Sequence, residues 1–253
     1  MNRSLKRFSF LLFPLFIFLI HLPFVFAKAK PYTKIMGHEA AIYGGTSASI
    51  EGAVSNNWLY VNMNLNAMGL SQEAFDYAVK GYEYLRSIGK LDNNILSIVD
   101  FSLSSTQKRL FVIDMENYKL LYNTYVAHGR NSGKEYATQF SNNPESFKSS
   151  LGFYITKGTY SGAHGFSLQL EGEEKGINDN ALRRAIVMHS ADYVNKSLIK
   201  TQGYIGRSLG CPALPKAMYK PIIETIKNGS CLFMFSPHSN YVSKSRLLQL
   251  ASS

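Results

Sequence analysis

The sequence predicts a mainly β domain with a few helices, arranged as a β-sandwich or a partly closed barrel. From Ile95 onward, apolar residues alternate with polar residues at a period of two, which is typical of strands. The apolar runs are short and are separated by turns that contain Gly and Asn, as in sandwiches and barrels. With 253 residues, of which 45% are hydrophobic and 17% charged, the chain has room for one sizeable domain and extensions.

The N-terminus has the pattern of an export signal. Three basic residues within the first seven positions precede an apolar run over residues 8–26, and Ala27 and Ala29 supply small residues at its end. This pattern predicts a secretory signal peptide over residues 1–27, cleaved after Ala27 or Ala29. The alternative is an uncleaved anchor, because the run is about long enough to span a bilayer. We expect an exported protein of the periplasm or cell envelope.

The chain is basic, with 27 Lys and Arg against 17 Asp and Glu. Without residues 1–27 the balance is 24 against 17, or +7. The positive charge is spread out and does not form the Lys/Arg clusters of nucleic-acid binders, so we expect no nucleic-acid partner. An exported basic protein favours loose association with anionic envelope surfaces. The alternative is that the charge only keeps the protein soluble.

Two segments precede the predicted strands. Residues 28–70 are rich in Tyr, Gly, Ser, Ala and Asn and have weak periodicity, which indicates a linker or a loosely packed N-terminal extension. Ser71 then fits a helix N-cap, and the helix is predicted to continue to Ser87 and to end at Gly89. Apolar residues recur along it at helical spacing, so this face is expected in the core.

Seven strands are expected. They lie at residues 95–103, 109–114, 119–126, 153–156, 166–170, 185–188 and 232–235. The turn at 115–118 joins the second and third strands into a hairpin. Two helices interrupt the strands, one near 180–184 and one from about 216 to 227, which Gly229 ends.

Two cysteines occur in the chain. Cys231 lies in an apolar run that is typical of a core strand, where a free cysteine behaves as a small hydrophobic residue. Cys211 stands between Gly210 and Pro212 on a short turn, and is therefore the cysteine placed to react. A disulfide between the two is the alternative in an oxidising compartment.

A reactive cysteine needs a base, and three histidines lie among the predicted strands. His189 follows the strand at 185–188 and precedes Cys211 by 22 residues, so the two side chains can meet across neighbouring strand ends. A thiol and an imidazole brought together in this way are sufficient for nucleophilic acyl transfer. His128 ends a hairpin strand and is a candidate for the same cleft, and His164 lies in a Gly-rich loop that is a candidate lid. The alternative for each histidine is a structural polar residue.

The segment Ile205-Gly-Arg-Ser-Leu-Gly-Cys-Pro212 resembles the motif of the L,D-transpeptidases, the YkuD-like enzymes that act on peptidoglycan stem peptides. In that family a histidine at a strand end is followed, after a loop, by Ser/Thr-His-Gly-Cys. His189 matches the first histidine, and Ser208, Gly210 and Cys211 match the later residues. The resemblance implies a YkuD-like fold and a cysteine nucleophile.

The resemblance covers about residues 95–236, and residues 150–155 (Ser-Leu-Gly-Phe-Tyr-Ile) are similar to the family's Thr-Pro-x-Gly-x-Phe-x-Ile segment. Two positions depart from the family. Leu209 stands where the motif has a histidine, which removes a side chain from the acyl pocket, and Pro212-Ala213 replaces the usual Arg or Asn. The segment Gly-Arg-Ser-x-Gly-Cys-Pro-Ala looks like a divergent branch of the same superfamily.

The resemblance implies a role for each matching residue. Cys211 would be the nucleophile, with its thiolate favoured by an adjacent His189 imidazolium. His189 would be the general base and then the acid toward the leaving amine. The backbone N–H groups of Gly210 and Cys211 would form the oxyanion hole. Ser208 would orient the turn or bind the substrate backbone, and the Ser190 carbonyl would fix the tautomer of His189.

The whole chain then reads as an exported, cysteine-dependent L,D-transpeptidase that acts on peptidoglycan stem peptides through an acyl-enzyme. The catalytic domain is expected at residues 71–240, followed by a C-terminal tail at 241–253. A stem peptide carries carboxylates, which the Arg207 guanidinium beside the nucleophile is placed to hold. The alternative for Arg207 is a surface arginine paired with an Asp. No cofactor and no metal is expected.

Two other classes of function stay open. A zinc hydrolase would use His128, His164, His189 and either Asp192 or Cys211, although no His-x-x-x-His or Cys-x-x-Cys spacing supports it. A non-catalytic cell-wall-binding protein of the same fold is the second alternative, because Leu209 replaces a motif residue. Asp192 and Tyr193 are candidates to buttress His189, or else ordinary polar residues.

Overall fold

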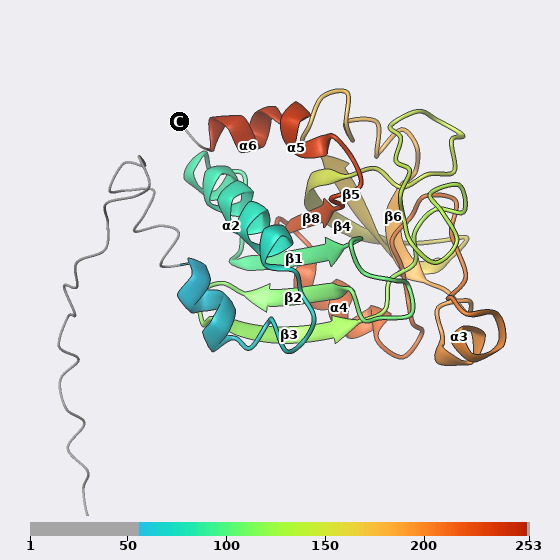
Figure 1. Cartoon of the computed structure of the whole chain (residues 1–253). Helices are drawn as coiled ribbons and strands as arrows, with labels where there is room; N and C mark the ends of the chain where they lie inside the picture. The colour runs from blue at the N-terminus through green and yellow to red at the C-terminus, as the bar shows by residue number, and fades with distance from the viewer. Residues whose placement is uncertain (1–55, 252–253) are drawn as a thin grey trace, which may run out of the picture. The chain divides into compact units, whose positions relative to one another are not determined.

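The computed structural model describes residues 56–251. The predicted signal peptide and residues 28–55 of the predicted extension lie outside these residues. The described part is a mainly β domain with short helices (Figure 1), which confirms the predicted fold class. Within residues 56–251, no helix has the length and apolar character needed to cross a bilayer.

One eight-stranded sheet organises the domain. Its strands are β1 (Ile95–Asp100), β2 (Leu110–Asp114), β3 (Lys119–Thr124), β4 (Gly152–Gly162), β5 (Gly165–Gly172), β6 (Val187–Ser190), β7 (Ala213–Leu214) and β8 (Cys231–Phe235). They are arranged in the order β3-β2-β1-β8-β4-β5-β6-β7. The pairs β1–β8 and β6–β7 are parallel and the other neighbours antiparallel.

The two edges of this sheet approach each other. Chain that continues beyond β3 reaches β7, because the Ala127 N–H donates to the Ala213 carbonyl at 2.9 Å. A bridge between Gly129 and Ser208 follows. The sheet is therefore a partly closed barrel, and the segment around residues 127–130 lies beside the segment that leads into β7.

The helices are α2 (Gln72–Ser87), α3 (Lys196–Gln202), α4 (Tyr219–Ile226), α5 (Tyr241–Lys244) and α6 (Arg246–Leu250), and residues 56–62 are also helical. The α2 N-cap is as predicted, since the Ser71 hydroxyl accepts from the Ala74 N–H at 3.3 Å. This helix packs on β1, β8 and α6. Gly81 permits the close approach, because a Cβ there would lie 2.0 Å from the Phe153 ring of β4.

The region before the turn that carries Cys211 differs from the prediction in three ways. Residues 180–184 form consecutive turns and not a helix, and Ala185 follows with a φ of 52°. Strand β6 begins at Val187, so His189 lies inside the strand and not beyond its end. Helix α3 occupies the expected loop, capped by the Asn195 side chain.

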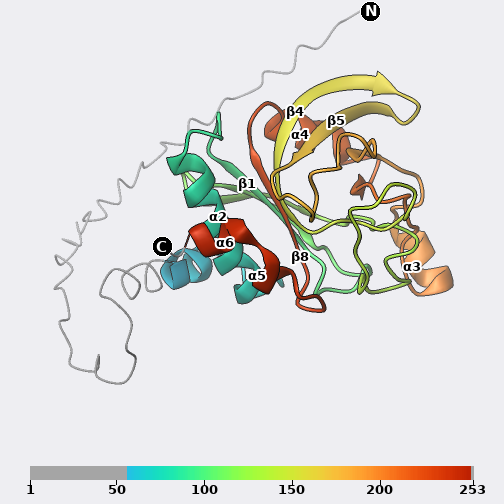
Figure 2. The ribbon, with the colours of Figure 1, turned by 90° about the horizontal axis from the view of Figure 1, so that it is seen from above.

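Both ends of the described chain contribute to the core. Leu65 and Leu70 belong to the predicted extension, and Leu247 and Leu248 to the predicted tail, yet all four side chains are buried. Figures 1 and 2 both place α6 next to α2, and the two helices are in contact. The packed domain therefore extends beyond residues 71–240 in both directions.

Candidate active site

The turn that carries Cys211 is closed by Ser208. The Ser208 hydroxyl donates to the Cys211 carbonyl at 2.6 Å and accepts from the Gly210 N–H at 3.0 Å. The backbone of Ser208 is paired as well, because its N–H donates to the His128 carbonyl and its carbonyl accepts from the Arg130 N–H. These bonds are compatible with the first of its two predicted roles, orienting the turn, and its role toward a substrate stays a prediction.

Gly210 allows the turn to lie close to its neighbours. Its φ is 127°, and a Cβ there would lie 2.9 Å from the Lys148 carbonyl oxygen and 3.0 Å from the Ile186 side chain. Only glycine adopts this conformation without strain. Its N–H is already used by Ser208, so it does not point freely into an oxyanion hole as predicted. Among the described residues, none accepts from the N–H of Leu209 or Cys211, which leaves these two donors available.

Both cysteines are free thiols. Cys231 is fully buried in β8, which confirms its structural position. The Cys211 sulfur accepts from the Val187 N–H at 3.5 Å, and its S–H points to the Ala185 carbonyl at 3.7 Å. Burial raises the pKa of the Cys211 thiol, and the Val187 N–H and the Arg184 guanidinium oppose part of that rise.

His189 lies on the strand next to the cysteine. Strands β6 and β7 run parallel with His189 beside Ala213, so Val187, two residues earlier, lies beside Cys211. Alternate residues of a strand share a face, which puts Val187 and His189 on the same side of the sheet. The thiol therefore lies beside Val187 on the neighbouring segment, and the imidazole belongs to the residue two positions further along β6.

The ring of His189 is oriented by its own strand. Its Nδ1 is 2.9 Å from the Ser190 carbonyl, the contact predicted for the tautomer. With the proton assigned to Nδ1, the Nε2 lone pair is available. Burial lowers the pKa of His189 below its ordinary value. The pKa directions of His189 and Cys211 favour a neutral imidazole and a neutral thiol, and not the predicted resting ion pair.

His164 reaches the site from the β4–β5 hairpin. Its ring stacks on the His189 ring, with centroids 4.2 Å apart and planes 20° apart. The charge of a protonated His164 also lowers the pKa of His189, after burial. Figure 2 shows this hairpin extending away from the rest of the sheet. The structure therefore brings the His164 ring onto the His189 ring, and the lid expected of this loop stays a prediction.

His128 does not line an open cleft, contrary to the prediction. Its side chain is fully buried, with Nδ1 2.6 Å from an Arg109 nitrogen and Nε2 3.2 Å from the Gly133 carbonyl. Burial and the Arg109 charge lower the pKa of His128 to about 3, so the ring is neutral. A histidine with both nitrogens occupied supports the loop beneath the catalytic turn.

Arg207 is also used by the protein itself. Its guanidinium donates to the carbonyls of Arg130 and Gly133 at 3.0 and 3.1 Å, and lies over the Tyr204 ring. These contacts fix the 130–133 loop to the turn, a role that neither predicted alternative described. Leu209, in the position of the motif histidine, is 57% exposed.

Sequence reasoning missed two arginines. Arg109 is fully buried and donates to the carbonyls of Leu103 and Val126 in addition to contacting His128. Arg184 donates to two carbonyls and two hydroxyls beside the catalytic turn. The charge of Arg109 at the start of an apolar strand was a usable signal, whereas Arg184 stands in a segment without a pattern.

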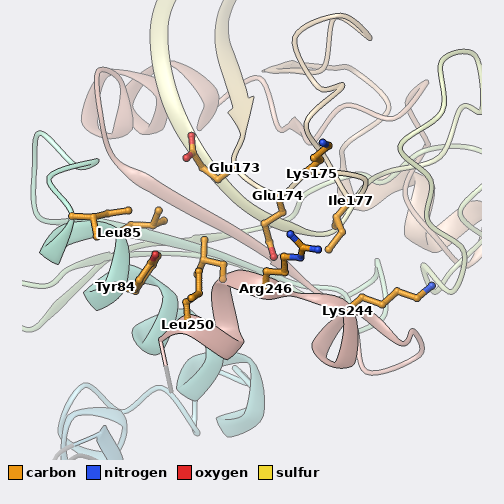
Figure 3. Close-up of a pocket in the computed structure, with 11 residues that line it drawn as sticks. Tyr84, Leu85, Glu173, Glu174, Lys175, Ile177, Lys244, Arg246 and Leu250 are labelled. Atoms are coloured by element: carbon orange, nitrogen blue, oxygen red, sulfur yellow. The ribbon is translucent and has the colours of Figure 1, made fainter. Parts of the chain in front are cut away.

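Three further features delimit the site. Asp192 forms an exposed ion pair with Lys216 at 2.6 Å and so does not buttress His189. The Tyr193 side chain packs against Gly206, so closely that a Cβ on this glycine would collide with it. Within residues 56–251, no three His, Cys, Asp or Glu side chains are grouped to hold a metal ion. A pocket of about 460 Å³ lies apart from Cys211, between the end of α2, residues 173–177 and α6 (Figure 3).

Comparisons with known proteins identify the domain. A family model described as the L,D-transpeptidase catalytic domain matches residues 66–235, which is more than half of the chain. No curated protein sequence matches.

Similar solved structures include an L,D-transpeptidase from Mycobacterium smegmatis (12% identity, TM-score 0.35), with 56% of this chain and 59% of that chain covered. The helical cell shape determining protein from Campylobacter jejuni is 16% identical with a TM-score of 0.40, and the match covers 70% of this chain and 60% of that chain. An L,D-transpeptidase from Stackebrandtia nassauensis is 14% identical with a TM-score of 0.35, and the match covers 75% of this chain and 80% of that chain. The chain thus spans less than two thirds of the first two proteins. At TM-scores below 0.5 these likenesses add no support, and the assignment rests on the family match.

Proposed function

Because the chain belongs to the L,D-transpeptidase catalytic domain family, we propose that it is an exported, cysteine-dependent L,D-transpeptidase that acts on peptidoglycan stem peptides. One observation carries the proposal. Cys211 lies against β6 at Val187, and His189, two residues further along β6, has its Nδ1 committed to the Ser190 carbonyl. This arrangement offers a nucleophile and an oriented base within one small region.

The reaction starts from a neutral pair. As the Cys211 sulfur attacks the carbonyl carbon of the L-to-D amide, His189 Nε2 takes the thiol proton and a C–S bond forms. The N–H groups of Leu209 and Cys211, which donate to no acceptor among the described residues, would hold the oxyanion. Collapse of this intermediate breaks the C–N bond, and His189 returns its proton to the departing amine of D-Ala. A thioester between Cys211 and the shortened stem peptide is left.

The acyl acceptor decides the outcome. An amine that attacks the thioester gives a cross-link, an exchanged D-amino acid or an attached protein, and water gives net carboxypeptidase action. All of these outcomes release the free Cys211 thiol again. The predicted signal peptide supports action outside the cytoplasm, and the basic mature chain supports loose association with anionic envelope surfaces.

Intact-mass spectrometry of the mature protein with a disaccharide-tetrapeptide tests the proposal. We expect a mass increase equal to the disaccharide-tripeptide acyl group, absent from Cys211→Ala. Cys231→Ala is the matched control, because this second cysteine is buried in β8 and should leave the adduct unchanged. The absence of both an adduct and turnover, in protein whose Cys211 is shown to be reduced, would contradict the proposal.

The second candidate is a non-catalytic protein that binds the cell wall. It is favoured by one observation, the exposed Leu209 in place of the motif histidine. Sedimentation with purified sacculi tests it. Binding without any acyl adduct would support this candidate over the enzyme.

A further inference from the structure

Arg184 lies directly against the turn that carries Cys211. Its Nη2 is 3.3 Å from the position that a Cβ would take on Gly210, the residue before the cysteine. The next residue after Arg184 is Ala185, whose carbonyl faces the Cys211 S–H at 3.7 Å. The guanidinium and the thiol are therefore neighbours on the β6 side of the turn.

The position of this guanidinium is fixed by four oxygen acceptors. They are the Ser141 carbonyl (2.8 Å), the Ser150 hydroxyl (2.9 Å), the Lys148 carbonyl (2.6 Å) and the Ser146 hydroxyl (3.3 Å). All four are uncharged. Among the described residues, the ion pairs do not include Arg184. The arginine therefore holds a rigid positive charge that no carboxylate neutralises.

Other titratable groups around Cys211 leave this charge unopposed. Tyr193 approaches from the loop after β6, and burial raises its pKa to about 12, so it is neutral. The Lys148 ammonium is turned to the Gln139 side chain at 2.7 Å. Arg207 on the turn itself is bonded to loop carbonyls. His189 on β6 is neutral at rest for the reasons given above.

We propose that Arg184 is a positioning residue that keeps an unneutralised positive charge beside Cys211 and thereby favours its thiolate. The inference rests on the proposed function, since it assigns the charge a use in acyl transfer. When His189 removes the thiol proton, negative charge develops on sulfur in a partly buried site. A fixed cation beside the turn favours that charged form, because it opposes the cost of desolvation.

The test is the rate at which iodoacetamide alkylates Cys211 from pH 6 to about pH 11.5, a range that extends above the raised pKa of this thiol. Only the thiolate reacts, so the midpoint of the rate profile reports ionisation of the thiol. Peptide mass spectrometry separates Cys211 from the buried Cys231. We expect Arg184→Gln to move the midpoint up by about one pH unit and to slow alkylation at pH 7 about tenfold.

Two further variants separate charge from structure. Arg183→Gln removes the neighbouring exposed arginine and should leave the profile unchanged. Arg184→Lys keeps the charge but not the four hydrogen bonds, and should keep the midpoint within about half a unit. If Arg184→Gln does not fold, the lysine variant decides: a midpoint raised by about one unit would overturn the inference. A folded Arg184→Gln protein with the wild-type midpoint would overturn it equally.

This measurement is independent of the transpeptidase reaction, because iodoacetamide needs no substrate site. A wild-type protein that forms no acyl adduct, together with the expected midpoint shift in Arg184→Gln, would remove the proposed function and leave the charge effect in place. An acyl adduct without any midpoint shift would remove only the role of Arg184.

Discussion

The two sides of the candidate site are built in different ways. On the cysteine side, the turn is tied to its neighbours through Ser208 and through a glycine that allows no side chain. On the other side, the β4–β5 hairpin leaves the sheet, and residues 157–165 are almost entirely exposed. Its tip meets the site through one described ring contact, His164 on His189.

The difference indicates which property each side supplies. A nucleophile must be held within a fraction of an ångström of its productive position, and buried hydrogen bonds provide that. An exposed hairpin with few contacts can open and close at little cost. We therefore expect changes in the turn to reduce stability and acylation together, and changes in the hairpin to reduce acylation alone.

The largest effect is expected for Gly210→Ala. The new Cβ would meet the Lys148 carbonyl at 2.9 Å in a backbone region that disfavours side chains. Acylation by the tetrapeptide should fall more than about 100-fold, with about 1–3 kcal/mol lost in the free energy of unfolding. Gly203→Ala is the control: it also has a positive φ but nothing within 4 Å, so acylation should persist. Equal acylation rates in the two variants would refute a special role for the turn.

Ser208→Ala should have the next largest effect. It leaves the Gly210 N–H and the Cys211 carbonyl without their hydroxyl partner in a buried turn. The expected loss is about 1–3 kcal/mol in stability, measured by urea unfolding, with roughly 10–100-fold slower acylation. Ser208→Thr keeps the hydroxyl and should recover most of both. A wild-type rate in Ser208→Ala would show that the turn does not depend on this residue.

His128 should make stability fall in acid. Its pKa is about 3 in the fold, below the unfolded value of about 6.5. The unfolded chain therefore binds more protons between these values, and stability present above pH 6.5 is lost as the pH falls, by about 1.4 kcal/mol per unit. Urea unfolding at pH 7.5 and 5 measures this. His128→Asn should reduce the pH dependence of the unfolding free energy, whereas His238→Asn, at an exposed position, should keep that of wild type. An unchanged pH dependence in His128→Asn would contradict the burial of His128.

The smallest effect is expected for His164→Ala. Loss of one ring stack, worth about 0.5–1.5 kcal/mol, should slow acylation about 2–10-fold and lower the free energy of unfolding by no more than that amount. His164→Phe keeps a ring and should recover the rate. In both variants the acid-side midpoint of the acylation profile should rise slightly, because the electrostatic effect by which His164 lowers the pKa of His189 is gone. Ser161→Ala in the same hairpin is the control, and a large stability loss in His164→Ala would erase the contrast between the two sides.

The sequence predicted what local patterns encode. Alternation identified the strands around the barrel, and Ser71 and Gly89 bounded α2, because half-buried strands and capped helices leave short-range signals. The prediction of a helix near 180–184 was wrong because contacts with residues distant in sequence determine the backbone conformation of that segment. The Asn178 amide donates to the carbonyls of Leu151 and Phe153, which ties the chain to β4 in a series of turns.

The same division holds for the site. A motif of a few residues selected Cys211 and His189, and the structure places them on neighbouring segments. The sequence could not predict where the His128 side chain points, since the same local sequence is compatible with a histidine that faces the core and with one that faces the cleft. Arg184 left no spacing pattern at all, because two of its four partners are backbone carbonyls 36 and 43 residues away.

The most direct test of the whole account is the single-turnover acylation rate of Cys211 as a function of pH, in wild type and His189→Gln. If a neutral His189 is the base, the wild-type rate should rise as the pH passes the lowered pKa of this histidine, below 6.5. His189→Gln should then be about 100-fold slower or more, with that rise abolished, while His238→Asn matches wild type. A His189→Gln protein that acylates within a few-fold of wild type, with the same pH profile, would contradict the assignment of the base and with it the proposed site.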